Sequence, residues 1–395
     1  MINYAKIMYI TLFVLLLSGC NPFAADETTQ KERSADHISF SQHNPHQKAQ
    51  PDIFIKNISI SAIGDILVHK RVYRDAKTND GYAFMPMMKQ VKPYLNDTTI
   101  SIANQETMIA GQAHGLSGYP TFNTPKSMGN TLKSLGIDVV SLANNHTLDQ
   151  GPAGVKSAIS HWEKLDMKYT GAYKSQRDRE RLRVFQSDAG IDTAFLSYTY
   201  GTNGIPVPTG QSYLVNTIDY AQMRRDINKA KQQADAVVLS LHAGDEYEPL
   251  PNQLQKNVVQ FAADLGVDAV IGHHPHVLQP IEWVEGKQGN RMLAAYSLGN
   301  FFSGQTALKK RIGGILKFDL EKRKDAQDTI QVKRPKFLLT YVTSAGPHNF
   351  EVLPMHDLDE ADLEDHQNVY LESKQHVSQF MPELKFVGSP KGGEG

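Results

Sequence analysis

The segment "DAVIGHHPHVLQPIE", residues 268–282, places three histidines directly after a short apolar run. His273, His274 and His276 follow Gly272, and imidazole nitrogens grouped in this way are typical ligands of transition metals. The alternative is a polar surface loop. In an extended segment, side chains alternate between two faces, so His274 and His276 would point to the same side. Each imidazole could then bind one ion of a two-metal centre, in which the ions lie about 3.5–4 Å apart.

Five further apolar runs end in side chains that can bind a metal. These runs are "ISISAIGD", "TTISIANQE", "IDVVSLANNH", "ADAVVLSLHAGDE" and "MLAAYSLGNF". Oxygen and nitrogen ligands without thiolate suit zinc, manganese, iron or magnesium and argue against a cysteine-rich structural zinc site. The sequence predicts a site for two divalent ions, with manganese, zinc and iron as the candidates. The predicted ligands are Asp65, Glu106, Asn145, His242, His274 and His276.

The pair Asn145–His146 suggests acid catalysis beside the metal. If Asn145 binds a metal, His146 is free to protonate a leaving group, and Asp149, three residues on, can orient its ring. The alternative for "NNH" alone is a turn that caps a helix, because asparagine favours turns. Together with the other runs, the pattern favours a catalytic role for His146 and Asp149.

A second group of residues near the same strand ends is predicted to contact the substrate or to support the ligands. For His69, four residues after Asp65, a substrate contact and an ordinary surface histidine both stay open. Tyr198 and Tyr200 follow another apolar run and either face the site or pack at a sheet edge. The group comprises His69, Asn104, Asn144, Glu246, His273 and Asn300.

Helix signals between the apolar runs indicate which elements position these residues. "PNQLQKNVVQFAADLG" predicts a helix over residues 251–266, which begins after a proline, ends at a glycine and has one apolar face. That face comprises Leu254, Val258, Phe261, Ala262 and Leu265. A second helix, after Pro152, places Val155, Ala158, Ile159 and Trp162 on one face. Alternating strands and helices predict an α/β fold, in which functional groups lie beyond the carboxyl ends of the strands.

The N-terminus "MINYAKIMYITLFVLLLSGC" has the features of a secretory signal. Its apolar run, residues 7–17, is shorter than the roughly 20 residues that span a bilayer. "LLSGC" resembles a bacterial lipobox, and Cys20 is the chain's one cysteine. We expect residues 1–20 to be a lipoprotein signal peptide and Cys20 to be lipidated, which anchors the chain to the extracytoplasmic face of the cell membrane. The alternative is an ordinary signal peptide or anchor with an incidental cysteine.

Composition divides the rest of the chain into three parts. Residues 21–52 are polar and predict a flexible tether, residues 53–350 carry the repeated pattern and predict one domain, and residues 351–395 form an acidic C-terminal extension. The chain has 41 Lys and Arg against 42 Asp and Glu, a formal net charge of −1, and no basic stripe. This balance argues against nucleic acid as a partner.

Six motifs together resemble a known family. "IGDILVH", "ANQE", "SLANNHTLDQG", "HAGDEYEPLPNQLQ", "GVDAVIGHHPHVLQPIE" and "YSLGNFF" are similar to the bacterial CapA family, the poly-γ-glutamate capsule-synthesis proteins. This family is placed within the calcineurin-like metallophosphoesterase superfamily, and the resemblance runs from about residue 58 to residue 302. It implies a four-layer αββα sandwich around a dinuclear metal site.

The resemblance also implies roles for individual residues. Asp65 matches the first metal aspartate, and Asn145 and His146 match the superfamily's ligand and general acid. His242 matches its isolated metal histidine. His274 and His276 match its paired histidines.

Two departures from the superfamily pattern concern the ligands. Its Asp-x-His opening is absent, because Ile66 and Leu67 follow Asp65. "NQE" replaces its second Gly-Asp motif, so that Glu106, or else Asn104, would bridge the ions. Fewer ligands at the first metal position predict one strong and one weaker metal site.

The resulting functional hypothesis is a metal-dependent hydrolase or transferase of the cell envelope. It would act on a phosphoester or amide-type bond in the synthesis, export or attachment of poly-γ-glutamate or a related anionic polymer. The alternative is a non-enzymatic component that binds metal or polymer within a membrane polymer-synthase complex. The pairing of His146 with Asp149 favours the enzyme, because a binding protein does not need it.

Overall fold

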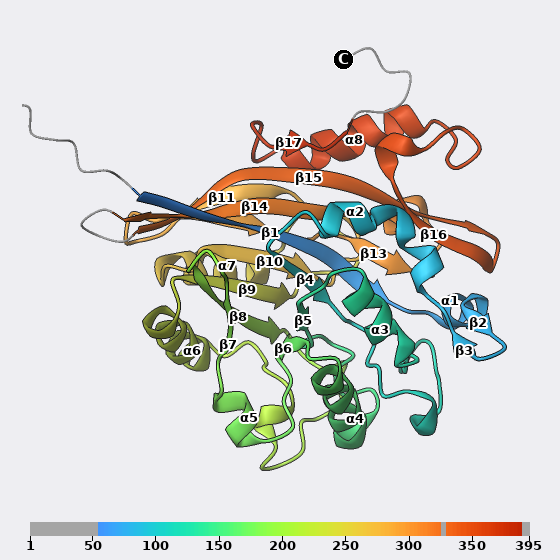
Figure 1. The fold of residues 1–395 in the computed structure, drawn as a ribbon, viewed down its shortest axis with the longest axis horizontal. Helices are drawn as coiled ribbons and strands as arrows, with labels where there is room; N and C mark the ends of the chain where they lie inside the picture. The colour runs from blue at the N-terminus through green and yellow to red at the C-terminus, as the bar shows by residue number, and fades with distance from the viewer. Residues whose placement is uncertain (1–53, 325–328, 389–395) are drawn as a thin grey trace, which may run out of the picture. The chain divides into compact units, whose positions relative to one another are not determined.

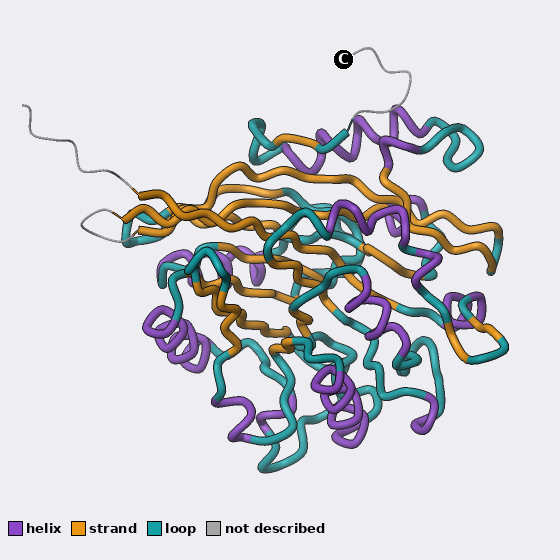
Figure 2. The backbone as a smooth tube through the Cα atoms, in the orientation of Figure 1, coloured by secondary structure: helices purple, strands orange, loops and turns teal. Residues whose placement is uncertain are grey.

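The computed structural model describes residues 54–324 and 329–388, which form two β-sheets stacked face to face with helices on their outer sides (Figure 1). Figure 2 shows the strands at the centre and the helices at the periphery. The predicted signal peptide, its Cys20 and the predicted tether lie outside the described residues.

The first sheet has the strand order β16-β15-β14-β1-β4-β5-β6, with β13 paired to β1 and β17 paired to β15. The pairs from β1 through β4 and β5 to β6 are parallel, and β14, β15 and β16 continue the sheet in antiparallel pairs. The strands are β1 (Phe54–Leu67), β4 (Ile100–Asn104), β5 (Val139–Ser141), β6 (Lys168–Thr170), β13 (Asn300–Ser303), β14 (Ile312–Lys324), β15 (Thr329–Ala345), β16 (His348–Pro354) and β17 (Lys385–Phe386).

The second sheet has the order β11-β12-β10-β9-β8-β7. Its four central strands are parallel, and β7 and β11 pair antiparallel at the edges. The strands are β7 (Arg183–Gln186), β8 (Asp192–Thr199), β9 (Ala236–His242), β10 (Ala269–His273), β11 (Ile281–Glu285) and β12 (Arg291–Ala295). A small hairpin, β2 (Lys77–Thr78) and β3 (Gly81–Tyr82), stands apart from both sheets.

Helices cover the outer faces of both sheets. Residues of α3 (Ser127–Ser134) and α4 (Gly151–Lys164) pack against the first sheet, and those of α6 (Tyr220–Gln233) and α7 (Gln253–Asp264) pack against the second. A third apolar cluster, which includes Ile60, Phe195 and Val238, fills the space between the sheets. The predicted four-layer αββα arrangement is therefore confirmed. The shorter helices are α1 (Lys70–Asp75), α2 (Lys92–Leu95) and α5 (Gln176–Glu180).

The two predicted helices form, with one error in an apolar face. In α4, Val155, Ala158, Ile159 and Trp162 are all buried as expected. In α7, Leu254 is 37% exposed. The inward position of that first turn belongs to Gln255, which completes a capping box with Asn252 and donates to the backbone oxygen of Tyr296 at 3.1 Å.

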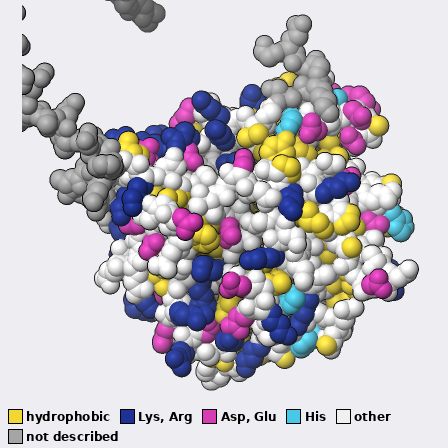
Figure 3. Space-filling model, in the orientation of Figure 1, with side chains coloured by type: hydrophobic (Ala, Val, Ile, Leu, Met, Phe, Trp, Pro, Cys, Tyr) yellow, Lys and Arg dark blue, Asp and Glu magenta, His cyan; other side chains and the backbone are white. Residues whose placement is uncertain are grey.

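The chain beyond residue 350 continues the first sheet. β16 pairs with β15, and α8 (His366–Ser378) contributes Tyr370 and Val377 to the cluster between the sheets. Residues 54–324 and 329–388 belong to one compact unit. On the face shown in Figure 3, Lys and Arg side chains are interspersed with Asp and Glu.

Within residues 54–324 and 329–388, every helix is too short or too polar to cross a lipid bilayer.

Candidate metal centre

The carboxyl ends of the central strands bring the predicted residues to one edge of the two sheets. In the first sheet, Asp65 of β1 is in register with Asn104 of β4 and with Asn300 of β13. In the second sheet, His242 of β9 is in register with His273 of β10. All five side chains are buried, and strand pairing fixes the position of each one.

Glycine is required immediately before two of these residues. A Cβ on Gly64 would lie 2.0 Å from the carbonyl oxygen of Gly299, and a Cβ on Gly272 would lie 2.0 Å from that of Tyr296. Only glycine allows two backbones to approach this closely. A larger residue at either position would push the two backbones apart and move the residue that follows it, Asp65 or His273.

The Asp65 carboxylate lies among donors from the histidine segment. Its Oδ1 accepts a hydrogen bond from Asn104 Nδ2 at 2.8 Å and lies 3.3 Å from His273 Nδ1. Its Oδ2 lies 3.1 Å from His276 Nδ1 and accepts the backbone N–H of His274 at 3.3 Å. Although burial acts to raise it, the neighbouring imidazoles hold the pKa of Asp65 well below its usual range. Asp65 thus holds the histidine segment against β1, and its role as a metal ligand stays a prediction.

Glu106 is fully buried between histidines from the second sheet. Its Oε1 lies 3.7 Å from His242 Nε2 and 3.6 Å from His276 Nε2. One ligand atom each from Glu106, His274 and His276 lies within 4.8 Å of the others. The geometry therefore places Glu106 at the centre of a group of potential metal ligands.

The buried polar atoms of this group fit a divalent cation. Neither carboxylate oxygen of Glu106 has a hydrogen-bond partner, and Asn104 Oδ1 and His274 Nδ1 are also buried without one. A buried carboxylate without a donor is costly, and burial raises the pKa of Glu106 well above its usual range. A cation bound here would supply the missing partner and would stabilise the ionised form. Residues of this kind suggest a divalent metal.

The protonation states of the histidines are compatible with metal binding. Burial lowers the pKa of His242 well below its usual range and that of His274 to about 3, so both rings are neutral and can offer a lone pair. Burial acts to lower the pKa of His276 too, but the carboxylates of Glu106 and Asp65 outweigh it and raise this pKa to about 9. His276 therefore carries a proton that offsets the charge of Asp65, and a bound metal would have to displace that proton.

The backbone around Pro275 differs from the extended segment that the sequence predicts. β10 ends at His273, and His274 and His276 have φ values of 99° and 59°, in the left-handed region. Their rings still lie on one side, with centroids 5.9 Å apart. The prediction was wrong about the conformation, because Asp65 draws the backbone N–H of His274 inward and bends the chain. Left-handed non-glycine residues are strained and cluster at functional sites.

His146 and Asp149 form the predicted pair. His146 Nδ1 lies 2.7 Å from Asp149 Oδ2, and the same oxygen accepts the backbone N–H of Phe122 at 2.6 Å. The edge of the His146 ring packs on Phe122, with centroids 4.7 Å apart. Glu106, His242, His274 and His276 are called the histidine cluster below. Asn145, the residue before His146, contacts this cluster directly, because its Oδ1 lies 2.9 Å from His242 Nε2. The ring of His146 is thus held in one orientation beside the cluster.

The supporting residues occupy different positions around the cluster. Asn144 accepts the backbone N–H of His146 at 3.0 Å, and Asn300 Oδ1 lies 3.1 Å from His276 Nδ1. His69 accepts the backbone N–H of Gly304 at 3.2 Å, and its ring packs on Phe122. Burial lowers the pKa of His69 to about 4. Glu246 is exposed.

Sequence reasoning missed part of the surroundings of the cluster. Tyr200, for which two positions were open, packs against His274 with ring centroids 4.6 Å apart and ring planes inclined at 43°. Tyr198 points away and donates to Asp226 at 2.7 Å. The missed residues are Asn203, which accepts from Asn145 at 3.2 Å, and Tyr247, whose ring lies 6.1 Å from that of His276. Tyr247 stands in the quoted motif "HAGDEYEPLPNQLQ", and its aromatic character was the available signal.

The sequence profile of the family described as "Bacterial capsule synthesis protein PGA_cap" matches residues 59–305. The chain is 28% identical over 267 residues to the PGA biosynthesis protein CapA of Bacillus subtilis, covering 67% of this chain and 68% of the relative. It is 26% identical over 275 residues to the capsule biosynthesis protein CapA of Bacillus anthracis, covering 67% of this chain and 64% of the relative. About a third of each relative therefore lies outside the similarity.

Two solved structures are similar to this chain at low sequence identity. The NAD nucleotidase of Haemophilus influenzae matches 85% of this chain and 65% of its own, at a TM-score of 0.45 and 12% identity. The calcineurin-like phosphoesterase YfkN of Bacillus subtilis matches 84% of this chain and 100% of its own, at a TM-score of 0.42 and 14% identity.

Proposed function

Because the chain belongs to the PGA_cap family of bacterial capsule synthesis proteins, we propose that it is a metal-dependent hydrolase or transferase that acts on an anionic capsule polymer. The bond that it breaks or transfers is of the amide or phosphoester type. The polymer is poly-γ-glutamate or a related polyacid. The proposal goes beyond family membership, which does not decide between an enzyme and a binding component.

One observation carries the proposal: the carboxylate of Glu106 is buried without a donor beside His242, His274 and His276. Asn145 extends this group through its contact with His242. The group would hold divalent metal through Glu106, Asn145, His242, His274 and His276, with Asp65 beside them. Such ions polarise the bond under attack and activate water at neutral pH. A site built only for structure would leave no reason for the separate pair of His146 and Asp149 next to it.

The chain's own residues would supply the proton for the leaving group. His146 donates Nδ1–H to Asp149 Oδ2, which fixes the tautomer of the neutral ring and leaves Nε2 as the atom that exchanges a proton. When the ring is protonated, Asp149 stabilises its charge, and Nε2–H can be given to a departing amine or alkoxide. Phe122 packs on the ring and limits its rotation.

The proposed place of action is the outer face of the cell membrane. Support comes from the sequence "LLSGC" at Cys20, where lipidation would anchor the chain by its N-terminus. A membrane polymer-synthase complex is the partner expected there. Radiolabelled fatty acid incorporated by the wild-type chain and not by Cys20→Ala tests the anchor independently of the enzyme activity.

Metal content of the purified full-length chain tests the central claim. We expect about one or two equivalents of manganese, zinc or iron by elemental mass spectrometry, and a loss of at least tenfold in His274→Ala/His276→Ala, because both imidazoles belong to the ligand group. A double variant of two histidines outside the cluster, His114→Ala/His161→Ala, is the matched control and should retain its metal. The absence of bound metal in the wild-type chain after reconstitution would contradict the proposal.

A further inference from the structure

A short basic helix lies beside the histidine cluster. η5 (Leu308–Arg311) carries three consecutive cations. Arg311 is used in the fold, because its Nε donates to the backbone oxygen of Val342 at 2.8 Å. Lys309 and Lys310 form no ion pair with other described residues. Two lysines of this helix therefore keep their charge available to a ligand.

Lys310 is positioned at the cluster by two separate links. Its Nζ lies 3.1 Å from the ring centroid of Tyr247, and that ring faces His276. Its backbone oxygen accepts Asn300 Nδ2 at 2.9 Å, and Asn300 Oδ1 in turn lies 3.1 Å from His276 Nδ1. The ammonium group is thus fixed relative to the histidine, and Lys310 stays partly exposed.

Tyr247 is itself held in a strained conformation. Its φ is 71°, and its backbone N–H donates to the oxygen of Pro275 at 2.8 Å. Its hydroxyl accepts Gln305 Nε2 at 3.3 Å. A left-handed tyrosine costs on the order of 1–3 kcal/mol, and such strain persists where surrounding contacts fix the position. The contacts place the ring and its bound lysine at the mouth of the cluster.

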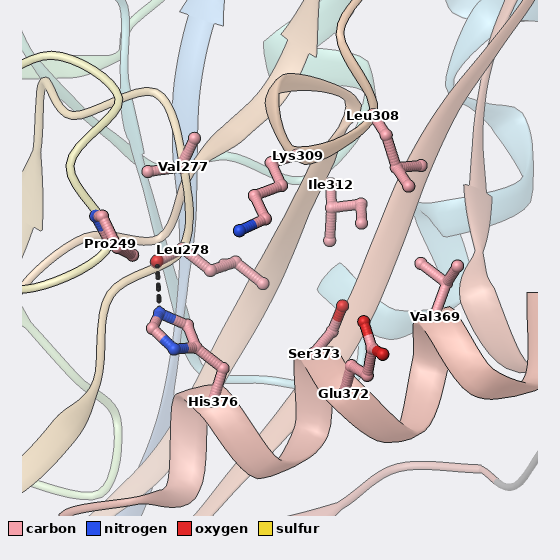
Figure 4. A pocket seen from close by; sticks show the side chains of 10 residues that line it. All are labelled: Pro249, Val277, Leu278, Leu308, Lys309, Ile312, Val369, Glu372, Ser373 and His376. Carbon is pink, nitrogen blue, oxygen red and sulfur yellow. Dashed lines mark hydrogen bonds between the residues drawn. The ribbon is translucent and has the colours of Figure 1, made fainter.

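The neighbouring Lys309 reaches a pocket of about 200 Å³ on the other side of η5. Figure 4 shows its ammonium group between the apolar side chains of Val277, Leu278 and Ile312. Ser373 and Glu372 of α8 face the same space, and His376 is bound to the backbone oxygen of Leu278 at 3.0 Å. Val277 is the residue after His276, so the pocket adjoins the cluster along the chain.

We propose that η5 and this pocket form the subsite for the acidic repeat unit next to the reacting bond, with Lys310 and Lys309 as ligands for successive carboxylates. The inference rests on the proposed function and deepens it. The apolar walls suit the methylene groups of a γ-linked polyamide. A polyphosphate has the charges but no apolar surface to bury, so the walls favour the polyamide.

Binding of a fluorescein-labelled γ-linked penta-glutamate to the full-length chain tests the subsite by anisotropy. We expect Lys309→Ala/Lys310→Ala to weaken binding at least tenfold. Glu372→Gln should strengthen it about twofold or more, since it removes a like charge from the pocket. The opposite directions distinguish a direct charge interaction from general loss of structure. Lys133→Ala/Lys168→Ala removes two exposed lysines near the amino ends of strands, far from η5 in the sheet order, and should leave affinity within twofold.

Two results would overturn the subsite. One is an unchanged affinity in the η5 double variant, and the other is equally tight binding of inorganic polyphosphate through the same two lysines. Metal content is measured on every variant. Normal metal with lysine-independent binding refutes the subsite and leaves the proposed function standing. Lysine-dependent binding by a chain that takes up no metal refutes the proposed enzyme and retains the subsite.

Discussion

At the scale of single residues, Glu106 and His276 show how the site divides its charges. The carboxylate of Glu106 has no donor within hydrogen-bonding distance, and its nearest histidine nitrogens are 3.6 and 3.7 Å away. The Nδ1 atom of His276 contacts the Asp65 carboxylate. The other ring nitrogen, Nε2, is therefore directed at Glu106. Charge-assisted hydrogen bonds usually have lengths of about 2.7–2.9 Å. The longer distances between Glu106 and the two histidines leave space for a metal ion between their ligand atoms.

The pair His146–Asp149 leads to a prediction about leaving groups. His146→Ala is expected to lower kcat by about 10²–10⁴-fold on a substrate with a poor leaving group, because the proton donor is removed. On an activated ester such as a nitrophenyl ester the loss should be much smaller, because that group leaves without a proton. Steady-state kinetics on the two substrates measure the difference.

Two comparisons make the leaving-group test specific. Asp149→Asn, which keeps a contact to Nδ1 but removes the charge, should fall between wild type and His146→Ala. Metal content should be unchanged in both variants, since neither side chain belongs to the ligand group. Equal losses on the two substrates would argue against general acid catalysis by His146.

At the scale of elements, an aspartate precedes three of the parallel strands and ties each one to its neighbour. Asp138 accepts the backbone N–H of Ser101 at 2.9 Å, Asp235 that of Asp192 at 2.9 Å, and Asp268 that of Val237 at 2.8 Å. The quoted runs "IDVV", "ADAV" and "VDAV" contain these residues. The aspartates therefore fix strand register at the end opposite the site, and register determines which side chains meet at the carboxyl ends.

The hydrogen bond between Asp268 and Val237 belongs to an aspartate whose protonation depends on pH. Burial raises the pKa of Asp268 to about 7, from an ordinary value of 3.8. Between those values the folded chain binds a proton that the unfolded chain has lost, so the free energy of unfolding decreases as pH rises through this window. The whole shift corresponds to about 4 kcal/mol at about 1.4 kcal/mol per unit, and partial exposure of the residue reduces the expected effect to about 1–2 kcal/mol.

Asp268→Asn should remove most of this dependence, because its amide oxygen can still accept the Val237 N–H without a charge. Urea unfolding at pH 5 and pH 8 measures the change in free energy for each chain. The variant is expected to be less sensitive to pH than the wild type and more stable at pH 8. Asp80→Asn, at an exposed residue between β2 and β3, should behave as the wild type does. An identical pH response of wild type and Asp268→Asn would show that Asp268 is ionised in the folded chain.

The sequence predicts best those helices whose apolar residues repeat at helical spacing because one whole face packs against a sheet. α4 packs one regular apolar face, and its four predicted residues are buried. The error in α7 has a long-range cause. Gln255 and not Leu254 is buried in the first turn, because its Nε2 donates to the buried Gln279 Oε1 at 2.8 Å. A polar residue buried by a long-range hydrogen bond carries no periodic signal. The bend at His274 is another long-range effect, produced by Asp65 from a strand 209 residues away.

At the scale of the whole molecule, the position of the site follows from the rule that parallel strands place functional groups beyond their carboxyl ends. That rule was sufficient to group Asp65, Asn104, His242 and His273 from the sequence. It says nothing about segments that approach the site from elsewhere. Tyr247 and η5 reach the cluster through loops, whose course depends on packing between distant parts of the chain, so Lys310 was not predictable.

The C-terminal segment shows the same dependence on the whole molecule. The acidic composition after residue 351 predicts an extension, yet five apolar side chains beyond Met355 are buried: Leu358, Tyr370, Val377, Met381 and Leu384. All five belong to the cluster between the sheets, and β17 pairs with β15. His376 also binds the backbone of Leu278, two residues after the cluster histidine His276. α8 therefore contributes to the core and closes one wall of the pocket beside the site.

A chain that ends at Met355 should consequently fail to fold. Burial of an apolar side chain of this size contributes roughly 1.5–3 kcal/mol, so loss of five removes on the order of 10 kcal/mol, as much as a typical domain's free energy of unfolding. Thermal unfolding followed by circular dichroism should show no cooperative transition for this chain, and little of it should remain soluble. A chain that ends at Gly388, which keeps the Tyr370 hydroxyl bonded to the Gly388 oxygen at 3.0 Å, is the matched control and should unfold cooperatively. Cooperative unfolding of the shorter chain, with its metal retained, would mean that the two sheets form a complete domain without α8.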